Sequence, residues 1–205
     1  EADRTIALTW EDNDKLDLLF VQGQNKIHVP TQVTNITEAG KKASFTIVMP
    51  DEITDGEPFN LYGVYGGGEV STTDRELIEL PAIEGTKLNE ENVGKKVMLR
   101  FAKTVDATGA VGSVNFEHVG FLFTTKIKVT GGTLDDITSV QLVGADAGNE
   151  TWAYNASENH FNMETGDFTA VGTGSNTVSF QNSEKDVTNN ILTVRNWQPA
   201  IGTAW

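Results

Sequence analysis

The sequence of 205 residues contains no cysteine. Disulfide bonds, thiolate zinc sites and cysteine nucleophiles are therefore all excluded. Long apolar runs are also missing, since no segment approaches the ~20 apolar residues that a membrane-spanning helix needs. Basic residues are few, 15 against 29 acidic ones, which gives a formal net charge of −14. A surface of this sign repels phosphate backbones, so we expect no nucleic-acid partner, and anionic membranes are disfavoured for the same reason.

The residues that are present predict an all-β protein. Hydrophobic residues make up 38% of the chain, enough to fill a core. Most apolar segments alternate with period two: in "ASFTIVMP", Ala43, Phe45, Ile47 and Met49 share one face until Pro50 ends the strand. Such strands, rich in Thr, Val and Ile and separated by turns about every 8–12 residues, are typical of sandwiches or barrels. Little helix is expected, and its best candidate is residues 88–96.

The length fits one large β domain or two domains of about 100 residues each. Residues 104–113, "TVDATGAVGS", are mostly small and lie between two predicted strands, so either a long hairpin or a domain linker fits. A division there predicts an N-terminal β-sandwich over residues 1–108 and a C-terminal β-sandwich over residues 109–205.

The stretch "LTWEDNDKLDLLF" raises the question of a calcium loop. Counting from Asp12, the fifth position is Leu16 and the twelfth is Gly23, so two required oxygen ligands are missing. Asp and Asn also collect at turns, because they bond their own backbone. We therefore predict a polar corner that leads into a half-buried strand with Leu16, Leu18 and Phe20 on its inner face. No metal site is assigned.

No catalytic constellation emerges either. His28, His118 and His160 show no metal-binding spacing, and there is no nucleophile elbow or phosphate-binding loop. Carboxylate pairs such as Asp51–Glu52 are adjacent in sequence, and neighbours on a strand point to opposite faces. A glycosidase would need two facing carboxylates roughly 5–10 Å apart in a cleft. We assign no catalytic residue and no cofactor, and expect a protein that is not an enzyme.

The four tryptophans, Trp10, Trp152, Trp197 and Trp205, have two interpretations. Two β-sandwich cores would use them as large buried aromatics. Alternatively, Trp152 and Trp197 form a platform on which a sugar stacks, and the chain is then a surface carbohydrate-binding β-sandwich module.

Several segments, taken in order, resemble the fimbrillin-like family, the subunits of Bacteroidales surface fimbriae. These segments are "TWEDNDKLDLLF", "FNLYGVYGGG", "VNFEHVGFLFTTKIKV" and "ITSVQLVGADAGNETWAYNASENHFNMETGDF", which span Thr9 to about Phe168. Each is short and degenerate, so the resemblance depends on their order and spacing.

The resemblance implies two tandem transthyretin-like (Greek-key) β-sandwiches and a pilin-like, non-enzymatic subunit that acts in cell adhesion. It implies a lipoprotein precursor that is exported to the outer membrane and becomes part of a fimbrium at the cell surface. Partners would be other fimbrial subunits, joined by donor-strand exchange, and a host or bacterial surface protein or glycan. In this family an N-terminal strand is removed after an arginine, and Arg4 is the residue that matches. Because the chain begins at Glu1, we expect a processed mature segment.

Overall fold

The computed structural model describes residues 8–81, 97–128, 130–131, 134, 137–143, 159–170, 177–181 and 186–199. Within these residues the all-β prediction is confirmed: the secondary structure consists of strands and short 3-10 turns such as Glu38–Gly40. No helix in this part of the chain is long and apolar enough to cross a bilayer. The predicted helix at 88–96 lies outside the described residues.

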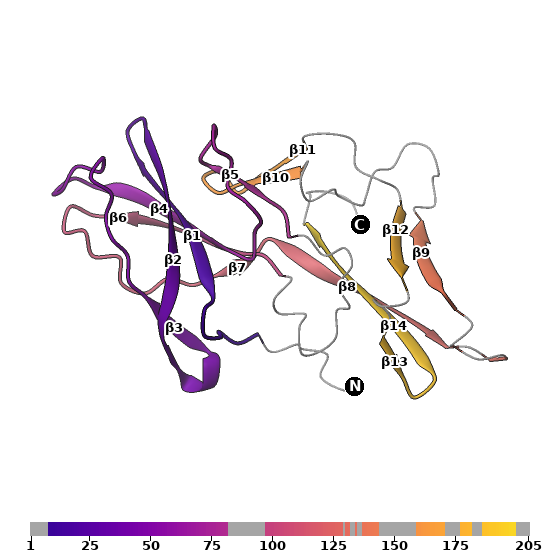
Figure 1. The fold of residues 1–205 in the computed structure, drawn as a ribbon. Coiled ribbons are helices and arrows are strands. Elements are labelled where there is room, and N and C mark those ends of the chain that lie inside the picture. Colours follow the sequence, from indigo (N-terminus) through magenta and orange to yellow (C-terminus); the bar gives the residue numbers. More distant parts are fainter. Residues whose placement is uncertain are drawn as a thin grey trace.

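The main structural unit is a six-stranded antiparallel sheet with the order β3-β2-β1-β4-β6-β7, which curls about its long direction (Figure 1). Three smaller sheets have the orders β11-β10-β5, β12-β9 and β13-β14-β8. The strands are β1 (Lys15–Gln22), β2 (Asn25–Thr37), β3 (Lys42–Phe45), β4 (Phe59–Tyr65), β5 (Leu77–Glu79), β6 (Leu99–Val105), β7 (Glu117–His118), β8 (Gly120–Lys128), β9 (Ser139–Val143), β10 (Asn159–Asn162), β11 (Phe168–Ala170), β12 (Thr177–Gln181), β13 (Asp186–Thr188) and β14 (Ile191–Pro199).

Strand β1 is central to the fold because it is apolar on both faces. Leu16, Leu18 and Phe20 face one side, as their alternation predicted, and are at most 3% exposed. The prediction of a half-buried strand was wrong for the other face, where Leu19 and Val21 are also buried. Successive side chains on a strand point to opposite faces, so the sheet must be covered on both.

The two faces are covered in different ways. One carries a core in which Leu19 and Val21 pack with Ile78 of β5, Phe161 of β10 and Trp197 of β14. The other carries the core of Leu16, Leu18 and Phe20. Side chains from two connections without strand pairing, residues 46–58 and 106–116, cover this second core together with Trp10; they are Ile47, Met49, Ile53, Val111, Val114 and Phe116.

The strand pairings connect the two predicted halves of the chain. Strand β5 pairs with β10, with Ile78 opposite Phe161. Residues 106–116 join the antiparallel strands β6 and β7, with Arg100 opposite Glu117, which is the geometry of a long hairpin. Figure 1 shows the chain passing from β7 into β8 and so from the six-stranded sheet to the β13-β14-β8 sheet. The division at 108/109 into two transthyretin-like sandwiches stays a prediction.

Polar side chains fix the β10–β11 hairpin to the main sheet. The Lys26 ammonium on β2 lies 2.8 Å from Glu76 Oε1 and 2.7 Å from Glu164 Oε2. Arg100 on β6 donates from Nε to the Met163 carbonyl (3.1 Å) and from Nη2 to the Glu164 carbonyl (2.9 Å). These contacts link β2, β6 and the segment before β5 to one turn of the hairpin.

Replacement of Gly63 by Ala should destabilise the protein. Gly63 lies opposite Phe101 in the β4–β6 pair, and an added Cβ would come within 2.0 Å of the Phe101 ring. The ring is part of the core and cannot move freely, so we expect a loss of about 1–3 kcal/mol in the free energy of unfolding, measured with urea. Gly131→Ala is the control, because a Cβ there meets nothing within 4 Å. Equal stability of the two variants would contradict this packing.

Removal of the Lys26 ammonium should lower stability only while its partners are ionised. Hydrogen bonding to Lys26 lowers the pKa of Glu76 below its usual 4.5, and hydrogen bonds to Glu164 and Glu76 raise the pKa of Lys26 above 10.5. The contribution of the Glu76 carboxylate to the free energy of unfolding is therefore complete above pH 4.5. It is lost as the pH falls through the lowered pKa of Glu76. The contribution of the Lys26 ammonium to the free energy of unfolding is complete below pH 10.5. It is lost as the pH rises through the raised pKa of Lys26.

We expect Lys26→Met to reduce the free energy of unfolding at neutral pH by at most about 1 kcal/mol, because the pair is partly exposed. The difference from wild type should shrink towards about pH 2, as Glu76 becomes protonated. Lys15→Met, which removes an exposed lysine, is the control and should show no such trend. A difference that stays constant from neutral to acid pH would rule out this ion-pair contribution.

Candidate functional site

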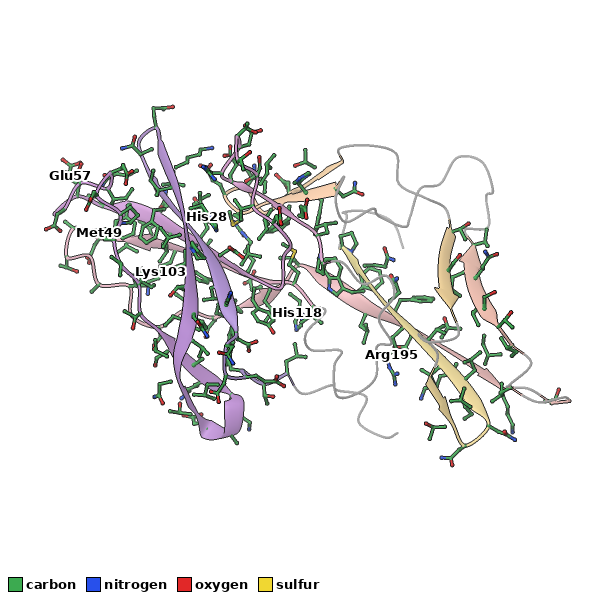
Figure 2. The ribbon with its side chains drawn as sticks, viewed as in Figure 1. His28, Met49, Glu57, Lys103, His118 and Arg195 are labelled. Carbon is green, nitrogen blue, oxygen red and sulfur yellow. The ribbon has the colours of Figure 1, made fainter. Side chains whose placement is uncertain are left out.

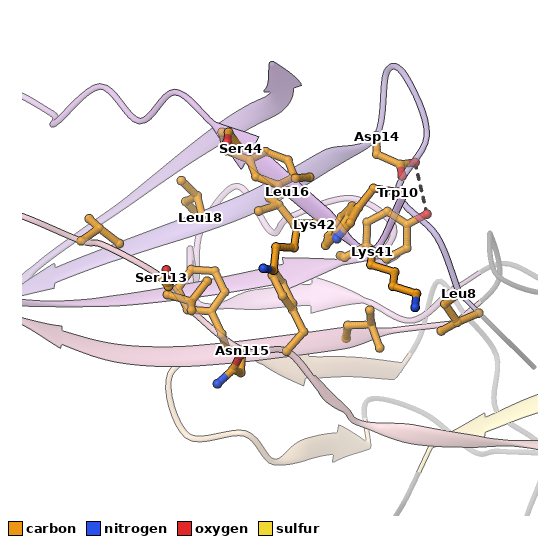
Figure 3. Close-up of a pocket in the computed structure, with 18 of the residues that line it drawn as sticks. Leu8, Trp10, Asp14, Leu16, Leu18, Lys41, Lys42, Ser44, Ser113 and Asn115 are labelled. Carbon is orange, nitrogen blue, oxygen red and sulfur yellow. Dashed lines mark hydrogen bonds between the residues drawn. The ribbon is translucent and has the colours of Figure 1, made fainter. Parts of the chain in front are cut away.

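A groove of about 620 Å³ lies over the second core. Its floor is formed by Leu16 and Leu18 of β1, Tyr65 of β4 and Leu99 and Phe101 of β6. One wall is made by residues 41–45 and Ile47, the other by residues 111–116, and residues 8–10 close one end. Figure 3 shows Leu16 and Leu18 between Ser44 of one wall and Ser113 and Asn115 of the other. A volume of this size is in the range of about 300–1,000 Å³ that is usual for ligand sites.

The two walls belong to the two edges of the same sheet. Within the described part of the chain, β3 pairs with β2 alone and β7 pairs with β6 alone. Residues 111–116, which lead into β7, take part in no strand pairing among the described residues. Because the sheet curls, β3 and the segment that leads into β7 line the same groove. Unpaired edge strands present backbone N–H and C=O groups that can pair with another strand.

The β3 wall confirms the alternation predicted for "ASFTIVMP". Ala43, Phe45, Ile47 and Met49 are half-buried and pack towards the core, or line the groove, whereas the residues between them are exposed. Val48, which points away, is 72% exposed. Pairing with β2 ends at Phe45, so the wall beyond it keeps the alternation without a partner strand.

Trp10 bridges the two walls at one end of the groove. Its ring packs edge-on against Phe45 on one wall (5.3 Å between centroids) and Phe116 on the other (5.4 Å). It also packs edge-on against Tyr65 on the floor (5.3 Å). The Trp10 backbone N–H donates to the Gly40 carbonyl (2.8 Å), which fixes the segment in place. Aromatic pairs of this geometry contribute roughly 0.5–1.5 kcal/mol each beyond the area they bury.

The predicted polar corner is confirmed and supports the same end of the groove. Asp14 N–H donates to the Glu11 carbonyl (3.1 Å), Glu11 N–H donates to Asp14 Oδ2 (2.8 Å), and Asn13 has a φ of 75°. The Tyr65 hydroxyl donates to Asp14 Oδ1 (3.2 Å). Burial and the adjacent Asp14 carboxylate raise the pKa of Tyr65 well above its usual value, so the hydroxyl stays protonated.

The structure places the predicted ligand residues as follows. Arg4 and Trp152 lie outside the described residues. Trp197 is 0% exposed and packs against Gly120, where an added Cβ would come within 2.2 Å of the indole. A sugar could reach the Trp197 ring only if the core opened, so the platform is not supported at this position. Trp10 is instead the described tryptophan that lines a groove.

The histidines do not gather at one site. His28 on β2 bonds Asp17 on β1 (2.8 Å), and His118 is exposed on β7, at a distance from His28 in Figure 2. His160 lies on β10, in a different sheet. Among the described residues there is no group of three or more His, Asp or Glu side chains that could hold a metal ion. What the groove offers chemically is an apolar floor, aromatic rings and one strand edge, that of β3, opposite the segment 111–116.

No protein-family model matches the sequence, and searches of curated proteins and of solved structures found no match. The resemblance to fimbrillin-like proteins therefore stays a prediction.

Replacement of Trp10 by Ala should loosen the groove. We expect a loss of about 1–3 kcal/mol in the free energy of unfolding, less than for a fully buried tryptophan because Trp10 is half-buried. Chymotrypsin should cleave at Phe116 faster, because the ring that holds the 111–116 wall is gone. Trp10→Phe keeps one aromatic ring and should lie between wild type and Trp10→Ala. Unchanged stability and cleavage in Trp10→Ala would show that Trp10 does not hold the walls.

Proposed function

We propose that this chain is a non-enzymatic, pilin-like surface subunit that acts in cell adhesion and assembles by β-strand addition into the groove. The observation that supports the proposal is that the free edge strand β3 and the unpaired segment 111–116, which leads into the other edge strand, line one groove. An extended segment placed there would gain backbone hydrogen bonds from the β3 edge and bury alternate side chains against the half-buried apolar residues of the groove. Assembly of this kind requires no catalytic group.

The sequence resemblance supports the same proposal. The segment "FNLYGVYGGG" contains β4, "TWEDNDKLDLLF" contains the corner and most of β1, and "VNFEHVGFLFTTKIKV" contains β7 and β8. The first two supply floor residues of the groove, and the third begins with the wall residues Val114, Asn115 and Phe116. The tandem transthyretin-like sandwiches, the fimbrial partners and the location at the outer membrane belong to this proposal.

Sheet topology restricts how a strand can enter. Every pair in the order β3-β2-β1-β4-β6-β7 is antiparallel, so β3 and β7 run in opposite directions. A strand between these edges would be antiparallel to one and parallel to the other. Both pairings occur in natural sheets, and the parallel one is slightly less stable per residue.

Processing at Arg4 should allow assembly if the proposal holds. Arg75 is exposed and would also be cut by an Arg-specific protease, so all proteins in the test carry Arg75→Ala. After proteolysis, we expect polymers in size-exclusion chromatography and electron microscopy. The same chain with Arg4→Ala should remain monomeric.

The groove itself is tested by two adjacent substitutions. Ile47 lines the groove, whereas Val48 points away from it. A carboxylate at position 47 costs free energy when an apolar strand covers it, so Ile47→Asp should prevent polymerisation. Val48→Asp makes the same chemical change outside the groove and should leave assembly intact. If the processed chain does not polymerise, or Ile47→Asp polymerises as well as Val48→Asp, strand addition in this groove is refuted.

One observation favours a surface carbohydrate-binding module as the second candidate. The Trp10 indole lines the groove together with Ser44, Ser113 and Asn115, whose polar groups could bond sugar hydroxyls. Binding on a glycan array that is lost in Trp10→Ala, with no polymer after proteolysis, would favour this function over strand addition.

A further inference from the structure

The groove has charged groups as well as an apolar floor. Lys41 and Lys42 are exposed residues of the β3 wall, and Asp14 lies near Trp10 (Figure 3). The remaining lining residues are apolar or carry no charge. In a chain with a net charge of −14, the groove thus carries two ammonium groups and one carboxylate.

Two of these three charged groups already have partners. Asp14 accepts hydrogen bonds from the Tyr65 hydroxyl and the Glu11 N–H. The Lys42 ammonium pairs with Glu38 (2.5 Å). The Lys41 ammonium makes no ion pair or hydrogen bond with any residue in the described part of the chain. Lys41 is thus the cation at the groove that is left for a bound group.

A strand in the groove would present two different faces. Its inward side chains would contact the half-buried lining residues, such as Phe45, Ile47 and Phe116, and so should be apolar. Its outward side chains, one residue away along the strand, would lie at the mouth, where the lysines are. A carboxylate at the outward position nearest Lys41 would complement its charge, and a basic residue there would be repelled.

We infer that the groove selects an extended protein segment with apolar residues at alternate positions and an Asp or Glu at the outward position that meets Lys41. This inference rests on the proposed function, since it names the strand that the groove accepts. The apolar face supplies most of the affinity. The charge contact supplies selectivity, because a slip of one residue would put the carboxylate against the apolar floor.

Synthetic peptides test this requirement. The probes are fluorescent ten-residue peptides that alternate Val and Thr, with a single Glu or a single Lys moved through each Thr position. Binding to the purified, Arg4-processed chain is measured by fluorescence anisotropy. We expect one Glu peptide to bind about two- to five-fold more tightly than its Lys counterpart, the range for one exposed ion pair. This preference should decrease at high salt.

The matched variants are Lys41→Glu and Lys15→Glu, which change the net charge equally. Lys15 is an exposed residue at the start of β1 that does not line the groove. Lys41→Glu should reverse the preference at the same peptide position, and Lys15→Glu should keep it. Persistence of the wild-type preference in Lys41→Glu would overturn the inference.

The failure of this inference and the failure of strand addition give different results. If Glu and Lys peptides bind with equal affinity, and Ile47→Asp abolishes both, the groove accepts strands but Lys41 does not select among them. If no peptide binds the folded chain, both the strand-addition function and this inference are overturned.

Discussion

The fold depends on one constraint, the need to cover both faces of β1. Leu16, Leu18 and Phe20 lie on one face, Leu19 and Val21 on the other, and all five are buried. The Leu19 face is covered by side chains from strands: β5 and β10, which pair with each other, and β14, which contributes Trp197. The cover of the Leu16 face consists of connections that supply side chains but are not paired as strands. The groove lies on this second face, where apolar burial is achieved without a complete layer of hydrogen-bonded backbone.

Curling of the sheet then brings two distant chain segments together. The β3 wall and the 111–116 wall are separated by some 65 positions in the sequence, yet Trp10 contacts Phe45 in one and Phe116 in the other. A closed barrel would remove both edges by pairing them. In this protein Trp10 fills the space between the walls at one end. Elsewhere along the groove, no strand pairing among the described residues joins β3 to the segment 111–116.

The sequence was sufficient to predict the local elements. Alternation identified the wall from Ala43 to Met49, and the failed calcium pattern identified the turn from Glu11 to Asp14. It could not show that β5 pairs with β10 some 80 residues later, because period-two patterns do not encode the partner of a strand. The burial of Leu19 could not be predicted either, because it depends on Ile78 and Phe161, which the β5–β10 pair brings to this face of the sheet. Nothing in the spacing of Trp10, Phe45 and Phe116 indicates their contact, since it depends on the curl of the whole sheet.

Most of the charged groups around the groove support its walls. Asp14 and Tyr65 bond each other, and Lys42 pairs with Glu38, so these groups are occupied in supporting the walls. An apolar floor alone would accept many alternating segments in either register. A charge at the mouth makes the two faces of the incoming strand unequal, and a one-residue slip exchanges those faces. In the proposed complex, affinity and register would therefore depend on different residues of the same groove: half-buried apolar side chains such as Phe45 and Ile47 would hold the strand, and Lys41 would align it.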